Sequence, residues 1–222
     1  MRPTLPAVLD RAHERIFVAG YAWVQTRSEA AGMRETRRDL VSRASGRVLE
    51  VGAGTGLNLD HYGAGVTDLT LVEPAPAMRE ALRAAWADGG VAAAAPADLR
   101  VLDGTGEALP AQDGSVDTVV GTFVLCSVDD PAAVLREVAR VLRPGGTYLG
   151  LEHVRAQDRR VARAQRLVAP GWRVLARGCR CGQDAVALVR SSPLTLESTS
   201  SFRGPRQPWP VRPGVRIVAR RD

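Results

Sequence analysis

Leu49-Glu-Val-Gly-Ala-Gly-Thr-Gly56 is the most informative segment of the sequence, because a short apolar run passes directly into a glycine-rich turn. The glycines, at spacing G-x-G-x-G, let the backbone approach a ligand without Cβ atoms in the way. A helix that follows such a turn adds partial positive charge at its N-terminus. The segment therefore predicts a small-molecule site at the end of a buried strand.

Short apolar runs alternate with helical patterns downstream of this loop, which is typical of a parallel sheet covered on both faces. Helices are expected at 76–87 and 130–142, because each combines an apolar stripe with a proline suited to a first turn. Strands are expected at 47–51, 69–73, 99–103, 116–122 and 147–152.

The flanking segments complete the expected fold. Two helices are expected within 5–44, an arginine-rich helix within 155–177 and another at 182–191. The ending, 194–202 and 215–221, reads as two strands joined by a proline-rich turn. The sequence thus predicts an α/β fold with a Rossmann-like, doubly wound, seven-stranded sheet, mostly parallel with an antiparallel C-terminal edge strand.

No break in composition separates a second domain, so we expect one domain over 1–222. Within it we expect a helical lid at 1–44, a ligand-binding core at 45–155 and substrate-side helices and edge strands at 156–222.

Composition and charge exclude several classes of protein. With 45% hydrophobic and 24% charged residues, the chain can bury a core and is not of the disordered class. The longest uncharged stretches, 16–26 and 118–128, fall short of the roughly 20 residues that span a bilayer. Charges near the N-terminus argue against a signal peptide, and three cysteines are an odd number for a disulfide framework. We expect a cytoplasmic protein.

The basic charge is concentrated in the last third of the chain. Residues 1–150 hold 15 Arg against 19 acidic residues, whereas 151–222 hold 15 Arg against 5. All Lys and Arg positions are Arg, which reflects a compositional bias. Aromatic residues, which could stack on nucleic-acid bases, make up only 5% of the chain. The high isoelectric point is therefore weak support for a nucleic-acid partner.

Three ligand classes compete for the glycine loop. A phosphate-binding NTPase loop needs Gly-Lys-Ser/Thr, but Leu57 follows Gly56 and the chain has no lysine. A dinucleotide fingerprint would place its third glycine at position 57. Glu50 is out of place beside a pyrophosphate, whereas it suits a ligand with an ammonium group, such as S-adenosylmethionine. Glu73 can hold both hydroxyls of a ribose through its two oxygens, which either an adenosyl or an NAD ligand would use.

Four segments resemble the class I S-adenosylmethionine-dependent methyltransferases: VLEVGAGTG (48–56), LTLVEPAPAM (69–78), GEALPAQDGSVDTVV (106–120) and LREVARVLRPGGTYLGLEHV (135–154). The resemblance is strong over 45–155. Within this superfamily, three further segments resemble the methyltransferase-like-7 group, whose animal members methylate small thiols: TFVLCSVDD (122–130), EHV (152–154) and GC (178–179).

The resemblance implies S-adenosylmethionine as cofactor, S-adenosylhomocysteine as its product, and a set of contacts. It places Glu73 on the ribose, and Pro74 and Met78 against the adenine face. Thr105 stands where many relatives have an Asp that receives the adenine amino group, so Asp103 or the Gly106 backbone would compensate. The methionine moiety would be lined by Glu50, Gly52, Ala53, Gly54 and Gly56.

We expect the methyl acceptor to bind just beyond the fourth strand. Thr122, Phe123 and Leu125 would lie where the methyl group meets the substrate, and Cys179 would line the substrate pocket. His153 is the candidate that orients or deprotonates the acceptor. In relatives of this architecture the segment before the first strand closes over the cofactor, which makes Tyr21 a candidate lid residue.

The sequence leaves three functions open. The leading one is methyl transfer by in-line displacement to a small molecule, with thiols as the first class to try. A nucleic-acid methyltransferase is disfavoured because Thr122-Phe-Val-Leu125 replaces the Asn/Asp-Pro-Pro-Tyr/Phe of amino-directed base methylases. A non-catalytic scaffold that binds S-adenosylmethionine is the third.

The cysteines and one histidine raise the question of a metal site. Cys126, His153 and the pair Cys179-Arg-Cys181 could hold zinc in principle. The C-x-C pair lacks the C-x₂₋₄-C spacing of ordinary zinc sites, so no metal is expected.

Overall fold

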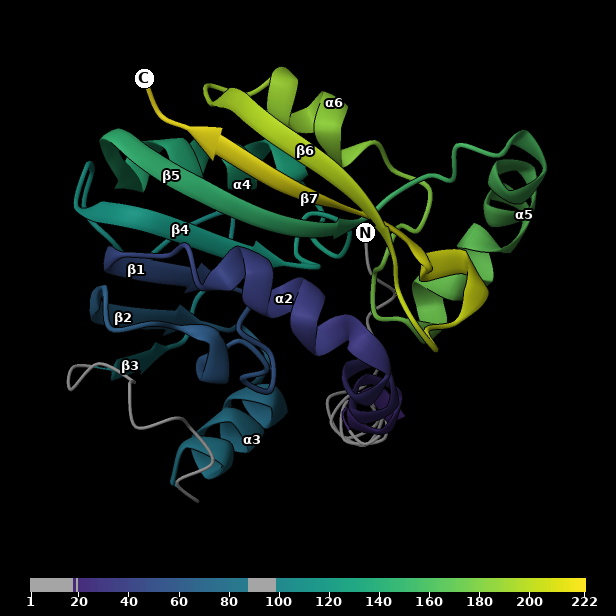
Figure 1. The fold of residues 1–222 in the computed structure, drawn as a ribbon, viewed down its shortest axis with the longest axis horizontal. Coiled ribbons are helices and arrows are strands. Elements are labelled where there is room, and N and C mark those ends of the chain that lie inside the picture. The colour runs from purple at the N-terminus through teal and green to yellow at the C-terminus, as the bar shows by residue number, and fades with distance from the viewer. Residues whose placement is uncertain (1–17, 19, 88–98) are drawn as a thin grey trace.

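The computed structural model describes residues 18, 20–87 and 99–222, which form one seven-stranded sheet with the order β3-β2-β1-β4-β5-β7-β6 (Figure 1). The strands are β1 (Gly46–Val51), β2 (Val66–Val72), β3 (Leu99–Leu102), β4 (Val116–Thr122), β5 (Leu142–His153), β6 (Thr195–Arg203) and β7 (Pro213–Arg220). Strands β1 to β5 pair in parallel, and β7 is antiparallel to both of its neighbours.

The predicted fold class is confirmed, and each expected strand overlaps an observed one. The strand that runs against the others is β7, and it lies between β5 and β6, so that β6 forms the edge. Strand β5 begins at Leu142 instead of 147, because the Arg143-Pro-Gly-Gly146 segment is extended after the helix ends. Leu142 pairs with Val116 across a register shift.

The helices begin where local capping groups lie. The predicted helix at 76–87 is α3 (Pro76–Ala87). In α4 (Pro131–Val141) the Asp130 carboxylate accepts a hydrogen bond from the Ala133 N–H at 2.9 Å. Asp158 and Asp184 cap the next two helices in the same way. Those helices are α5 (Arg159–Leu175) and α6 (Ala185–Arg190).

Ahead of the sheet, residues 20–28 are helical and continue through a π-helical turn, η1 (Glu29–Met33), into α2 (Arg34–Val41). A kink at Gly32, with φ 118°, interrupts this run. Of the two helices expected within 5–44, the part at 1–17 and at 19 lies outside the described residues. Two short 3₁₀ turns, η2 (Leu59–His61) and η3 (Trp209–Val211), complete the elements.

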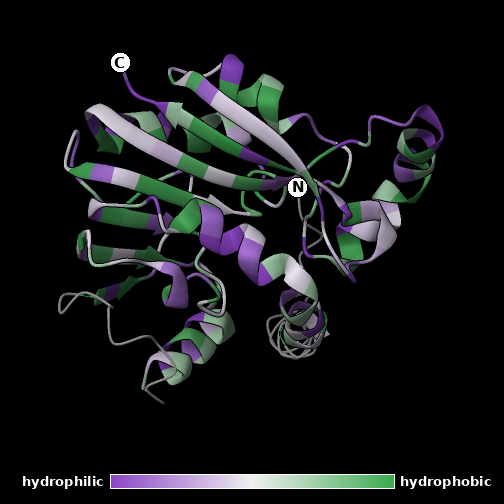
Figure 2. Cartoon of the chain, viewed as in Figure 1, coloured by the Kyte–Doolittle hydropathy of each residue, from purple (hydrophilic) through white to green (hydrophobic). Residues whose placement is uncertain are grey.

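Helices cover both faces of the sheet, as the hydrophobic patterns predict. On one face, α4 and α6 contribute Val134, Leu135 and Val189 to a cluster with the strands. On the other face, α2 and α3 contribute Leu40 and Leu82. Figure 2 shows hydrophobic residues running along the strands between these layers. The chain is therefore doubly wound.

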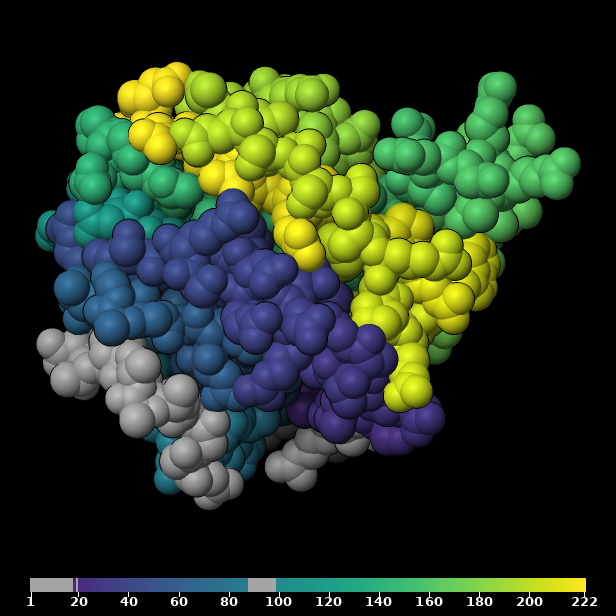
Figure 3. Space-filling model, viewed as in Figure 1, coloured from purple at the N-terminus to yellow at the C-terminus, as the bar shows by residue number. Residues whose placement is uncertain are grey.

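Helix α5 projects from the side of the sheet, next to the loop that carries η3 (Figures 1 and 3). It exposes Leu167 and Leu175 among its arginines. Within the part of the chain that the structure describes, no helix is long and apolar enough to cross a membrane.

Candidate active site

A cavity of about 780 Å³ lies at the carboxyl ends of β1, β2, β4 and β5, the edge of an open parallel sheet where ligands bind. Helical residues 20–28 form one side, and the C-terminal end of α5 with the loop before η3 forms another. Its volume is in the range that holds a cofactor and a small second substrate together.

The three loop glycines have different roles. A Cβ added at Gly52 would lie 2.9 Å from Val124 Cγ2, and one at Gly56 would lie 2.6 Å from Leu82 Cδ1. Those two glycines are needed for close packing. Gly54, with φ 59°, has no atom within 4 Å of an added Cβ and lines the cavity. Gly54 thus leaves the space that a ligand would fill.

Glu73 follows β2 and faces the same cavity. Its Oε2 accepts a hydrogen bond from the Gly54 N–H, and its Oε1 accepts one from the Ala75 N–H, each at 2.9 Å. The side chain is 7% exposed. These bonds fix the carboxylate between the glycine loop and the start of α3, where a ribose diol can reach it.

Glu50 lies beneath the loop instead of lining the cavity. Its Oε1 accepts from Asn58 Nδ2 at 2.7 Å and its Oε2 from the Tyr62 hydroxyl at 2.6 Å. Burial raises the pKa of Glu50 to about 7, although both hydrogen bonds oppose this shift. Glu50 therefore braces the turn after β1, and both of its oxygens are engaged within the protein.

A buried arginine extends this network to the next strand. Arg37, on α2, is 2% exposed. It donates to Asn58 Oδ1 at 2.8 Å, to Thr122 Oγ1 at 3.1 Å and to Glu29 Oε1 at 3.1 Å. The helical segment before β1 is thereby tied to the cavity floor at the end of β4.

Phe123 lies at the centre of the part of the cavity where the sequence predicts the methyl acceptor. This residue has φ 61°, a backbone conformation that costs roughly 1–3 kcal/mol for a residue other than glycine and that recurs at functional sites. Its ring stacks on the His153 imidazole, with centroids 4.1 Å apart and planes at 15°. The unfavourable backbone holds the ring over His153, at the end of β5.

Glu152 shapes the turn after Phe123. Its buried carboxylate accepts hydrogen bonds from the backbone N–H groups of Val124, Leu125 and Cys126 at 2.8–3.0 Å. Burial raises the pKa of Glu152, while the three N–H groups act in the opposite direction. The turn carries Cys126 to within 3.5 Å of His153 Nδ1.

Most residues proposed from the sequence line this one cavity, and five do not. Those that line it are Tyr21, Gly52, Gly54, Glu73, Pro74, Met78, Thr105, Gly106, Thr122, Phe123, His153 and Cys179. Those that do not are Glu50, Ala53, Gly56, Asp103 and Leu125.

The structure accounts for these departures by burial or by pairing with another side chain. Ala53 and Leu125 are buried in the hydrophobic core, and Gly56 packs against Leu82. Asp103 forms a two-pronged ion pair with Arg79 at 2.9 and 3.0 Å. In place of Leu125, the cavity is lined by its neighbours Val124, Ser127 and Val128.

Sequence reasoning missed Arg37, Glu152 and Trp172. A signal existed for Arg37, because it lies on the same helical face as Met33, Leu40 and Val41, which are buried. The other two depend on contacts between distant segments.

The residues present suit S-adenosylmethionine. The open space at Gly54 admits a ligand backbone, and Glu73 offers a fixed acceptor for ribose hydroxyls. Pro74 and Met78 supply an apolar wall beside Glu73 for an adenine ring. When bound, this cofactor supplies an electrophilic methyl group on a sulfonium.

Comparisons with known proteins agree with this fit. A family model described as a methyltransferase domain matches residues 49–150. Thiol S-methyltransferase TMT1B of Homo sapiens is 34% identical over 81% of this chain and 74% of that protein. Thiol S-methyltransferase TMT1A of Homo sapiens is 35% identical over 79% of this chain and 73% of that protein.

Solved structures show the same fold. An S-adenosylmethionine-dependent methyltransferase of Thermotoga maritima has a TM-score of 0.67 and 21% identity, with 94% of this chain and 97% of that chain covered. The YcgJ protein of Bacillus subtilis has a TM-score of 0.65 and 18% identity, with 84% and 98% covered.

Fold and site together define a class I S-adenosylmethionine-dependent methyltransferase. The chain belongs to the methyltransferase domain family.

Proposed function

We propose that the enzyme transfers the methyl group of S-adenosylmethionine to the sulfur of a small thiol. The observation that carries this proposal is that His153 and Cys179 line the same cavity as Gly54 and Glu73. The two human thiol S-methyltransferases, at 34% and 35% identity, support the same acceptor class.

Methyl transfer from a sulfonium needs few catalytic groups on the protein. A sulfonium is an excellent leaving group, so the protein has to align a nucleophile, exclude water and remove a proton. A thiol with a pKa of about 8.5 is partly ionised near neutrality, whereas an alcohol needs a strong positioned base. The acceptor side offers one imidazole, His153, among apolar walls. This arrangement favours a thiol over an alcohol.

The walls around His153 exclude water and orient the acceptor. Phe123, Val128, Trp172 and Val211 contribute apolar surface to this part of the cavity. Among the described residues, the buried Trp172 Nε1 has no hydrogen-bond partner. Because Trp172 also lines the cavity, this N–H is available to a polar group on the acceptor.

A cytoplasmic location stays a prediction from the sequence, as does the division of the chain into lid, core and substrate-side parts.

An acceptor panel tests the proposal. Purified protein is incubated with S-adenosylmethionine and, separately, with alkyl thiols, phenols, amines and RNA, and methylated products are detected by mass spectrometry. We expect methyl thioethers together with S-adenosylhomocysteine. Methylation of RNA or of amines without thiols would overturn the acceptor class, and cofactor binding without turnover on any acceptor would favour a scaffold.

A further inference from the structure

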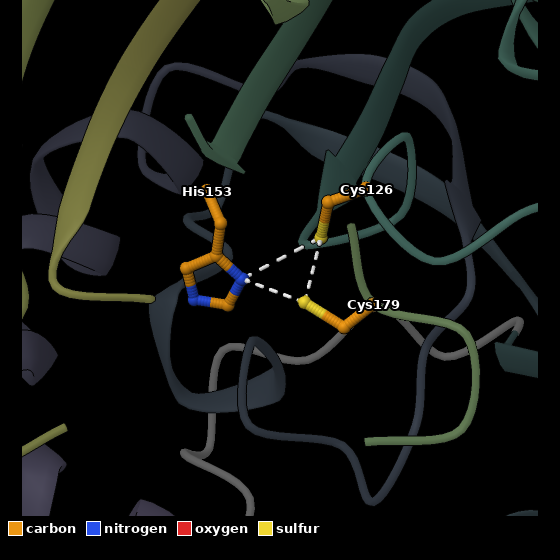
Figure 4. A group of neighbouring side chains, drawn as sticks. All are labelled: Cys126, His153 and Cys179. Carbon is orange, nitrogen blue, oxygen red and sulfur yellow. Dashed lines mark hydrogen bonds between the residues drawn. The ribbon is translucent and has the colours of Figure 1, made fainter. Parts of the chain in front are cut away.

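Three potential metal ligands from distant parts of the chain meet beside the cavity (Figure 4). Cys126 lies in the turn after β4, His153 ends β5 and Cys179 follows α5. Cys126 Sγ lies 3.5 Å from His153 Nδ1, Cys179 Sγ lies 3.7 Å from the same nitrogen, and the two sulfurs are 3.9 Å apart.

These separations match one tetrahedral zinc ion. With Zn–S bonds of about 2.3 Å and a Zn–N bond of about 2.0–2.1 Å at tetrahedral angles, two sulfurs lie about 3.8 Å apart and each sulfur lies about 3.5 Å from the nitrogen. The observed triangle of 3.5, 3.7 and 3.9 Å differs from this geometry by a few tenths of an ångström at most. Little movement of the chain is needed to bind the ion.

The surrounding structure holds each ligand in place. Glu152 accepts one hydrogen bond from the Cys126 N–H and two from the N–H groups of the two residues before it, and Phe123 stacks on the His153 ring. The Arg180 backbone N–H donates to the Cys126 carbonyl at 2.6 Å, which joins the Cys179 segment to the Cys126 turn. Among the described residues, the buried His153 Nε2 has no hydrogen-bond partner, so stacking on Phe123 orients the ring in place of the hydrogen bond that usually orients a metal-bound histidine.

We propose that Cys126, His153 and Cys179 bind one Zn²⁺ ion whose fourth coordination position faces the cavity and accepts the sulfur of the substrate. His153 and Cys179 line the cavity, whereas Cys126 is fully buried behind them. Three protein ligands with one open position are the arrangement of catalytic zinc, and Cys₂His is one of its known ligand sets. This inference rests on the proposed function and names how the acceptor is activated.

Cys179-Arg-Cys181 does not act as a chelating pair, so its unfavourable C-x-C spacing does not exclude zinc. In the structure only Cys179 of that pair joins the group, and Cys181 is buried outside it. The other two ligands are Cys126, in the turn after β4, and His153, at the end of β5. They are far apart in the sequence, so the short C-x₂₋₄-C spacing does not apply to them.

Zinc binding would give the substrate sulfur its reactive form. A thiol that coordinates zinc loses its proton, here to solvent, so the acceptor is a thiolate before transfer. Its sulfur then forms a bond to the methyl carbon while the bond from that carbon to the sulfonium breaks. The products are a methyl thioether, S-adenosylhomocysteine and the released proton. Because a thioether is a weaker ligand than a thiolate, the product leaves the metal.

The first test measures metal content. Protein expressed with added zinc and purified under reducing conditions, without chelator, should hold one zinc ion per chain by plasma mass spectrometry. Cys126→Ser and Cys179→Ser should each lose most of it, whereas Cys181→Ser, a buried cysteine two residues from Cys179, should retain it. Zinc at a small fraction of one per chain, or equal zinc in all three variants, would overturn the proposal.

A second test uses unaltered protein, so that misfolding of a variant cannot decide the result. After removal of zinc, the protein is titrated with Co²⁺ and its absorption is recorded. We expect thiolate-to-cobalt charge-transfer bands and the intense visible bands of tetrahedral cobalt, and both should change when an alkyl thiol is added. A spectrum of octahedral cobalt, or one that the thiol leaves unchanged, would contradict a site with an open position.

Turnover separates this inference from the function on which it rests. If metal-free protein methylates thiols as fast as zinc-loaded protein, the zinc site is wrong and the proposed function stands. If zinc binds in stoichiometric amount and the cobalt spectrum responds to thiol, but no thiol is methylated, the metal site stands and the proposed function fails.

Discussion

Glu73 Oε2 accepts a hydrogen bond from the backbone N–H of Gly54 at 2.9 Å, which joins the end of β2 to the glycine loop after β1. The two residues thus form one unit of the cavity wall. Gly54 leaves open space in the cavity, and Glu73 fixes the loop around that space. We propose that this space takes the cofactor and that the Glu73 carboxylate binds its ribose.

Replacing Glu73 should weaken cofactor binding. In Glu73→Ala, two ribose hydroxyls lose a charged acceptor, which should cost about 1–3 kcal/mol of binding free energy. Calorimetric titration with S-adenosylhomocysteine measures the change. Glu80→Ala, at an exposed position on α3, is the matched control and should bind as the unaltered protein does. Unchanged affinity in a folded Glu73→Ala protein would show that the ribose site lies elsewhere.

A comparison of Gly54→Ala with Gly114→Ala distinguishes the effect of ligand contact from that of backbone strain. Both have positive φ, 59° and 63°, so an alanine at either position carries a similar penalty of about 1–2 kcal/mol. Only the methyl group at Gly54 enters the cavity. Thermal unfolding should therefore show similar destabilisation, while cofactor affinity should fall at least tenfold for Gly54→Ala alone. Equal affinities for the two variants would refute the role of Gly54 in the site.

The buried carboxyl of Glu50 should make stability depend on pH. Its pKa is raised from 4.5 to about 7, so the folded state holds this proton more tightly than the unfolded state. The stabilisation is fully present below pH 4.5 and is lost as the pH rises through about 7.

Denaturant unfolding of Glu50→Gln beside the unaltered protein measures this dependence. The glutamine cannot titrate, so the unaltered protein should lose up to about 3 kcal/mol relative to Glu50→Gln across this range. His61, whose pKa is lowered to about 4, acts with opposite sign in both proteins and cancels in the difference. A difference in unfolding free energy that does not vary with pH would contradict a protonated Glu50.

Trp172 should affect acceptor binding through its Nε1–H. Trp172→Phe keeps an aromatic wall and removes the donor, so we expect KM for an acceptor with a polar group beside its thiol to rise roughly tenfold, the equivalent of one hydrogen bond. The kcat should change little. Trp209→Phe, at a partly exposed position, is the control. A fall in kcat with unchanged KM would place Trp172 in the transfer step instead.

The fold could be predicted because its signals are local. Pro76 opens α3 and Asp130 caps α4, where a fixed φ and a side-chain acceptor define the start of each helix. The β5 start could not be predicted, because Arg143-Pro-Gly-Gly146 reads as a helix stop and joins the strand only because Leu142 and Thr147, on either side of it, pair with β4. The position of β7 between β5 and β6 is likewise a property of the assembled sheet.

Among the residues of the candidate active site, the sequence identifies those that lie in the glycine loop or at the end of a strand. Gly54 and Glu73 are of this kind, because loop geometry and strand topology place them together. The contact between Cys126 and Cys179 joins positions 53 residues apart, and it depends on how α5 returns to the sheet. The role of Glu50 also differs from the expectation, since Asn58 and Tyr62 take both of its oxygens.

The most direct test of thiol methylation is a competition within one molecule. An acceptor that carries both a thiol and a hydroxyl, such as 4-mercaptophenol, is incubated with the enzyme and S-adenosylmethionine bearing a ¹³C-labelled methyl group. The carbon chemical shift of the product then identifies the atom that received the methyl group. We expect labelled S-methyl product with no labelled O-methyl product, whereas transfer to the oxygen would rule out a preference for thiols.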